Sequence, residues 1–61
     1  MEYQIYIEAD GAVTPHFEPV FAHSIDEART AAIGLLRQRP RATQALIYDR
    51  ENLLAMIDPA A

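Results

Sequence analysis

Residues 24–40, SIDEARTAAIGLLRQRP, hold the one strongly helical pattern in the sequence. Ser24 and Glu27 form a Ser-x-x-Glu capping box, in which the serine oxygen accepts from the glutamate amide at a helix start. Apolar residues then recur at the spacing i, i+3, i+4, i+7, i+8 that defines one face of a helix, namely Ala28, Ala31, Ala32, Leu35 and Leu36. Pro40 cannot continue a helix. The stretch predicts a single amphipathic helix, and its alanines allow it to lie close against a sheet.

Two extended segments precede this helix. Residues 3–8, YQIYIE, alternate between apolar and polar side chains, which is typical of a half-buried strand. Asp10-Gly11 is a turn signal. Residues 15–22 are also extended, but Pro15 and Pro19 cannot donate to a strand ladder. We therefore expect this second strand at an edge of the sheet.

Two more strands are predicted after the helix. Residues 42–49 and 53–58 flank the polar turn Asp49-Arg50-Glu51-Asn52. The predicted order is β-β-α-β-β, an α+β fold of two layers in which one helix packs on one face of a mostly antiparallel four-stranded sheet. We expect one small domain over residues 1–61, with residues 58–61 as a frayed end.

The length and composition indicate that the chain has a partner. It has 61 residues, 51% of them hydrophobic, and no cysteine. Domains below about 70–80 residues usually need disulfides, a metal or oligomerisation to be stable, and without cysteine the first is excluded. No run of 18 apolar residues is present and the first residues lack the basic region of a secretory signal, so we expect a cytoplasmic domain without a membrane span.

The last hairpin is apolar on both faces, whereas a single helix covers only one. One face carries Ala45, Ile47, Leu53, Ala55 and Ile57. The other face is the predicted interface, composed of Tyr6, Leu46, Tyr48, Leu54 and Met56. Such a patch is close to the upper limit that monomers expose. Two partners are compatible with it: a second copy of the chain in a symmetric homodimer, or a different protein.

Three of the five basic residues fall within five positions, at Arg37, Arg39 and Arg41. Arginines at a helix end complement the helix dipole and can satisfy its carbonyls. They could instead anchor an acidic partner or contact phosphates. A net charge of −4 and a pI of about 4.8 argue against a nucleic-acid binder, which needs a broad positive surface.

No arrangement of polar residues predicts a catalytic centre, a cofactor site or a metal site. Ser24 and His23 are adjacent, but the serine hydroxyl is occupied as a helix cap. His16 and Glu18 share a strand face, yet their spacing matches no zinc signature. Four carboxylates lie in the first half of the chain, namely Glu2, Glu8, Asp10 and Glu18. These side chains suit a solvated surface better than acid–base catalysis. We therefore expect a protein that is not an enzyme, with no small-molecule substrate.

The strand over residues 1–8, followed by the Ser-x-x-Glu-Ala helix start, resembles the HicB-type antitoxin domain over less than half of the chain. The proline–glycine–cysteine segment of that family is absent, and two strands rather than one follow the helix. The β-β-α-β-β plan also resembles compact phage-encoded inhibitors. From the residues themselves we expect a small protein–protein interaction module that homodimerises. The resemblances imply the alternative, an inhibitor or antitoxin-like regulator that docks on a specific host protein or nucleoprotein complex.

Overall fold

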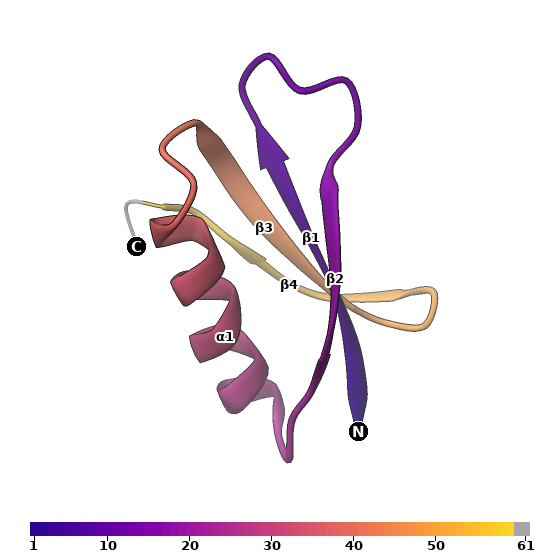
Figure 1. The fold of residues 1–61 in the computed structure, drawn as a ribbon. Coiled ribbons are helices and arrows are strands. Elements are labelled where there is room, and N and C mark those ends of the chain that lie inside the picture. Colours follow the sequence, from indigo (N-terminus) through magenta and orange to yellow (C-terminus); the bar gives the residue numbers. More distant parts are fainter. Residues whose placement is uncertain (60–61) are drawn as a thin grey trace.

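The computed structural model describes residues 1–59 and confirms the predicted α+β fold. The elements, in chain order, are β1 (Glu2–Ala9), β2 (His16–Phe21), α1 (Ile25–Arg37), β3 (Ala42–Asp49) and β4 (Asn52–Ile57). All four strands form one antiparallel sheet in the order β2-β1-β3-β4, and α1 lies across one of its faces (Figure 1). Within residues 1–59, no helix is both long and apolar enough to cross a membrane.

The two central strands supply the buried layer of the sheet. Ile5 of β1 lies opposite Ile47 of β3, and Ile7 lies opposite Ala45. These four side chains are at most 1% exposed. The edge position predicted for the proline-bearing strand is confirmed, because β2 pairs only with β1.

Small residues on α1 allow the helix to approach this layer closely. Ala28 and Ala32 are fully buried, and Leu36 is buried one turn further along. Tyr3, Ala22 and Ile57 complete the buried set. Because protein interiors are packed as densely as organic crystals, the distance between helix and sheet depends on these alanine methyl groups.

The start of α1 follows the predicted cap, with one difference. Ser24 is extended, and its Oγ accepts from the amide of Glu27 at 3.3 Å. Glu27 Oε1 accepts from the backbone N–H of His23 at 3.1 Å, one residue earlier than a capping box predicts. It also lies 3.2 Å from His23 Nδ1. The backbone N–H and then the ring of His23 hold the pKa of Glu27 below its ordinary value of 4.5.

The β3–β4 hairpin corrects one sequence prediction. Leu53 was expected on the buried face, but it lies opposite Tyr48 and is 47% exposed. The register shifts between Ile47 and Tyr48, so that Leu54 is an extra residue in a β-bulge. The β4 residues before the bulge, Asn52 and Leu53, therefore point to the opposite side of the sheet from the one that strict alternation predicts. After β4, residues 58 and 59 are exposed, and the rest of the predicted frayed end lies outside the described residues.

We predict that Ala32→Leu lowers the free energy of unfolding by about 1–3 kcal/mol, because the added carbons have no room between α1 and the sheet. Urea unfolding followed by circular dichroism measures the change. Ala31→Leu is the matched control, since Ala31 is only half-buried and a larger side chain there can extend toward solvent. An equal loss in both variants would contradict close packing at Ala32.

We predict that Glu27→Gln destabilises the protein near neutral pH but not in acid. The pKa of Glu27 is lowered in the folded state, so its ionised form contributes stability above 4.5 that is lost as pH falls through the lowered folded value. The difference in stability between wild type and Glu27→Gln should therefore become smaller below pH 4.5. Thermal unfolding between pH 7 and 3 measures it. Glu51→Gln, in the exposed β3–β4 turn, should show no such trend.

Candidate functional site

The sheet face that points away from α1, here called the open face, carries an apolar row across all four strands. Directly opposed residues on neighbouring strands point to the same side of a sheet. Phe17 lies opposite Tyr6, Tyr6 opposite Leu46, and Leu46 opposite Met56. These four residues form what we call the open-face row, which is continuous from β2 to β4.

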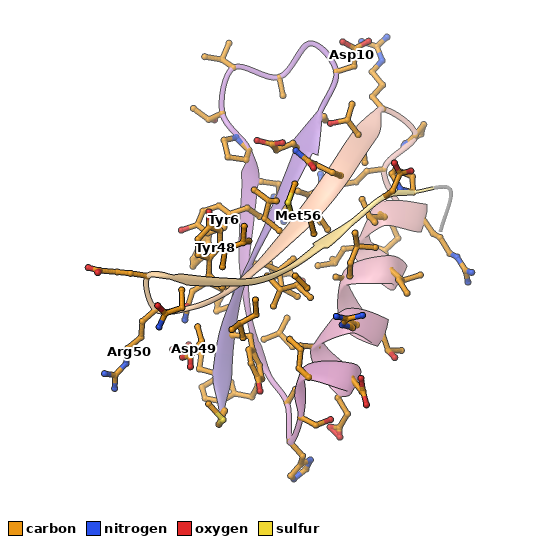
Figure 2. The ribbon with its side chains drawn as sticks, turned by 180° about the vertical axis from the view of Figure 1, so that it is seen from behind. Tyr6, Asp10, Tyr48, Asp49, Arg50 and Met56 are labelled. Atoms are coloured by element: carbon orange, nitrogen blue, oxygen red, sulfur yellow. The ribbon has the colours of Figure 1, made fainter. Side chains whose placement is uncertain are left out.

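Aromatic contacts hold the centre of this face together. The ring centroids of Tyr6 and Phe17 are 5.1 Å apart. Tyr6 meets Tyr48 at 5.5 Å with an interplanar angle of 83°, the edge-to-face geometry that aromatic rings prefer. Figure 2 shows Tyr6 and Tyr48 together on the side of the sheet away from α1. The rings are thus set in position before any partner arrives.

A shallow hollow of about 310 Å³ lies beside these rings. Tyr6, Leu46 and Tyr48 line it, with Pro15, Arg50 and Glu51 at its rim. Its centre is apolar and its rim charged, which is the usual anatomy of a protein interface. The ends of the open-face row remain in solvent, since Phe17 is 47% and Met56 62% exposed.

The structure brings four of the five predicted interface residues together. Tyr6, Leu46 and Met56 belong to the open-face row, and Tyr48 packs on Tyr6. Leu54 is 43% exposed but occupies the bulge, outside the cross-strand pairing.

Sequence reasoning missed the contribution of β2 to the open face. Phe17, Pro19 and Phe21 alternate with half-buried residues, and Phe21 is 81% exposed. The register places them opposite Tyr6, Gln4 and Glu2 on the same face. The spacing of two residues between these side chains is the feature of the sequence that indicates a shared sheet face.

A strained turn lies at the edge of the open face. Arg50 has φ 57°, in the left-handed region that favours glycine, and is the one described residue other than glycine with positive φ. Its backbone N–H donates to Gln4 Oε1 at 2.9 Å, which ties the turn to β1. Arg50 is exposed and extends from the hairpin, as Figure 2 shows.

The three arginines predicted as a partner anchor do not form one cluster. Arg37 and Arg41 are exposed, whereas Arg39 is half-buried. The helix-end carbonyls of Leu35 and Leu36 accept from the backbone N–H groups of Gln38 and Arg39, so they do not depend on arginine side chains. The carbonyl of Arg41 accepts from the amide of Asp10 at 2.8 Å.

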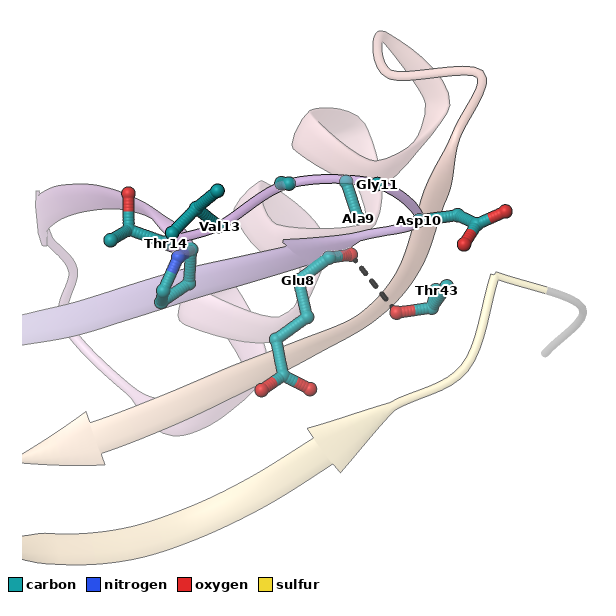
Figure 3. A pocket seen from close by; sticks show the side chains of 9 residues that line it. Glu8, Ala9, Asp10, Gly11, Val13, Thr14 and Thr43 are labelled. Carbon is teal, nitrogen blue, oxygen red and sulfur yellow. Dashed lines mark hydrogen bonds between the residues drawn. The ribbon is translucent and has the colours of Figure 1, made fainter.

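The carboxylates of the first hairpin do not form an acid–base pair. A hollow of about 340 Å³ at the β1–β2 loop includes Glu8, Asp10 and Thr43, but Figure 3 shows the two carboxylates pointing apart. Thr43 Oγ1 donates to the carbonyl of Glu8 at 3.2 Å, and Gln44 Nε2 donates to its carboxylate. Glu18 is opposite Ile5 on the other face.

The histidines are also paired locally rather than with each other. His16 Nε2 lies 3.4 Å from Glu18 Oε1, and His23 contacts Glu27 beyond the end of β2. Over residues 1–59, no three His, Cys, Asp or Glu side chains are grouped as a metal site would require. The open face is therefore the candidate site with the strongest geometric support.

Comparisons with family models, with curated proteins and with solved structures find no match for this chain.

We predict that Arg50→Gly raises the free energy of unfolding by less than about 1 kcal/mol. The left-handed backbone costs a non-glycine residue about 1–2 kcal/mol, and the greater freedom of unfolded glycine offsets part of the gain. Urea unfolding measures the change. Glu51→Gly is the matched control, because Glu51 has no positive φ and its replacement should destabilise. A loss of stability in Arg50→Gly would show that the turn is not strained.

Proposed function

We propose that this protein is a non-enzymatic protein–protein interaction module that forms a homodimer through its open face. The observation that supports this most strongly is the open-face row, an uninterrupted apolar band over four strands that no part of the described chain covers. Aromatic residues and methionine are the side chains enriched in the buried centres of interfaces.

The dimensions of the molecule are compatible with a stable dimer. The described chain has principal extents of 31 × 21 × 14 Å, so its broad faces are those parallel to the sheet. A standard interface buries about 800 Å² per partner. The accessible surface of the chain is 4283 Å², so that the open face would have to supply about a fifth of the total.

The charges around the open face favour a second copy of the chain. Glu8 is next to Gln44 near one end of the strands, while Arg50 is bonded to Gln4 toward the other end. A twofold axis in the interface, perpendicular to the strands, brings Arg50 of each copy toward Glu8 of the other. Both copies then present the open-face row to each other, and two rim charges of opposite sign meet on each side.

The double variant Leu54→Glu with Met56→Lys tests the proposal. Both side chains are at least 43% exposed, so the monomer should remain folded while charges enter the interface. We predict a dimer for wild type at tens of micromolar and a monomer for the variant, measured by analytical ultracentrifugation. The melting temperature of wild type should also rise with concentration, because association stabilises only folded chains.

Val13→Glu is the control, because Val13 is 99% exposed in the β1–β2 loop, outside the open face. It adds a charge at an exposed apolar residue and should leave the dimer intact. A wild-type protein that remains monomeric at tens of micromolar would contradict the homodimer. A folded double variant that still dimerises would place the interface elsewhere.

A further inference from the structure

Arg39 stands apart from the other arginines of this region. It is half-buried, and its Nε is shielded from solvent without a hydrogen-bond partner. Its guanidinium makes no ion pair or side-chain hydrogen bond with any residue in the described part of the chain. The charge of Arg39 is therefore not paired within residues 1–59, and it is available to an anion from outside the chain.

Arg39 lines a groove of about 400 Å³ beside the β1–β2 hairpin. The α1–β3 connection, which carries Arg39, and the β1–β2 loop meet at the same end of the molecule (Figure 1). Polar atoms enter the groove from Arg39, His16 and Thr14. The remaining wall is apolar and consists of Ile7, Ala9, Ala12, Pro15 and Phe17. The volume is within the range of ligand sites.

A guanidinium in this position favours an anion. Its Nε is covered, which leaves the two Nη groups as the donors available to a ligand, and a guanidinium edge matches a planar carboxylate with two parallel hydrogen bonds. Partial burial lowers the effective dielectric and strengthens the attraction. His16 also lines the groove, and its ring can donate or accept a hydrogen bond.

The surroundings favour a single negative charge on an apolar body. Glu18 lies 3.4 Å from the His16 ring, and the chain carries a net charge of −4, so a dianion such as phosphate meets repulsion. The apolar side chains of the groove offer burial to a short hydrocarbon chain.

We propose that this groove binds the carboxylate of an aliphatic chain, with Arg39 holding the carboxylate and Ile7, Ala12 and Pro15 holding the chain. The groove shares Pro15 and Phe17 with the margin of the open face, whereas Arg39, which holds the carboxylate, lies outside that face. A free aliphatic acid and an aliphatic residue at the carboxyl terminus of a protein share this chemistry.

Titration of ¹⁵N-labelled protein with sodium hexanoate, at constant ionic strength, tests the site. Saturable shifts are expected at the amides of residues 12–14, 16 and 17 and of Arg39. Hexanamide, which has the same shape without the charge, should bind at least about tenfold more weakly. N-acetyl-leucine is the probe for a protein carboxyl terminus. Tighter binding of hexanoate indicates a free aliphatic acid as the ligand, and tighter binding of N-acetyl-leucine indicates a protein carboxyl terminus. Inorganic phosphate should not saturate these residues.

Arg39→Lys keeps the charge and loses the fork of two donors, so it should weaken hexanoate binding about tenfold. The matched control Arg37→Lys, two residues earlier and fully outside the groove, should bind as wild type does. Equal binding of hexanoate and hexanamide, unchanged affinity in Arg39→Lys, or saturation by phosphate alone would overturn the proposal. Repeating the titration on the Leu54→Glu, Met56→Lys variant should give the wild-type result, which separates this site from the dimer.

Discussion

The packing of α1 against β1 and β3 is the interaction on which the rest of this structure depends. Ala28 and Ala32 of the helix are buried in the same core cluster as Ile5 of β1 and Ile47 of β3. Residues 1–59 contain one helix, which covers one face of the sheet and leaves the other face uncovered. The apolar residues that remain are concentrated on the open face, which is why a domain this small points to a partner.

The open face and the Arg39 groove have different chemistry. The open face is broad, aromatic and nearly uncharged at its centre, as a surface for another folded chain must be. The groove is smaller and combines one unpaired cation with an aliphatic wall, which fits a chain end or a small acid. Pro15 and Phe17 are common to both, because they lie at or just before the start of the edge strand β2.

Periodicity predicted the elements, their order and the face of most residues, because those depend on spacing within a segment. It placed Tyr6 and Leu46 on one face and Ala45 and Ile47 on the other, as the structure has them. The bulge at Leu54 and the contribution of Phe17 depend on pairing between strands, which spacing does not define. Likewise, proximity in the sequence groups Arg39 with the exposed residues Arg37 and Arg41. The partial burial of Arg39, which distinguishes it from them, depends on tertiary packing.

The central claim is that two copies meet face to face through the open-face row. Isotope-filtered NOE spectroscopy on an equal mixture of ¹³C-labelled and unlabelled protein observes such a contact directly. Because the twofold axis perpendicular to the strands places β4 of one copy over the β3–β4 side of the other, the account predicts intermolecular NOEs from the methyl group of Met56 to the side chains of Leu46 and Tyr48 in the other copy. Intermolecular NOEs confined to α1, or none at concentrations where ultracentrifugation finds a dimer, would contradict it.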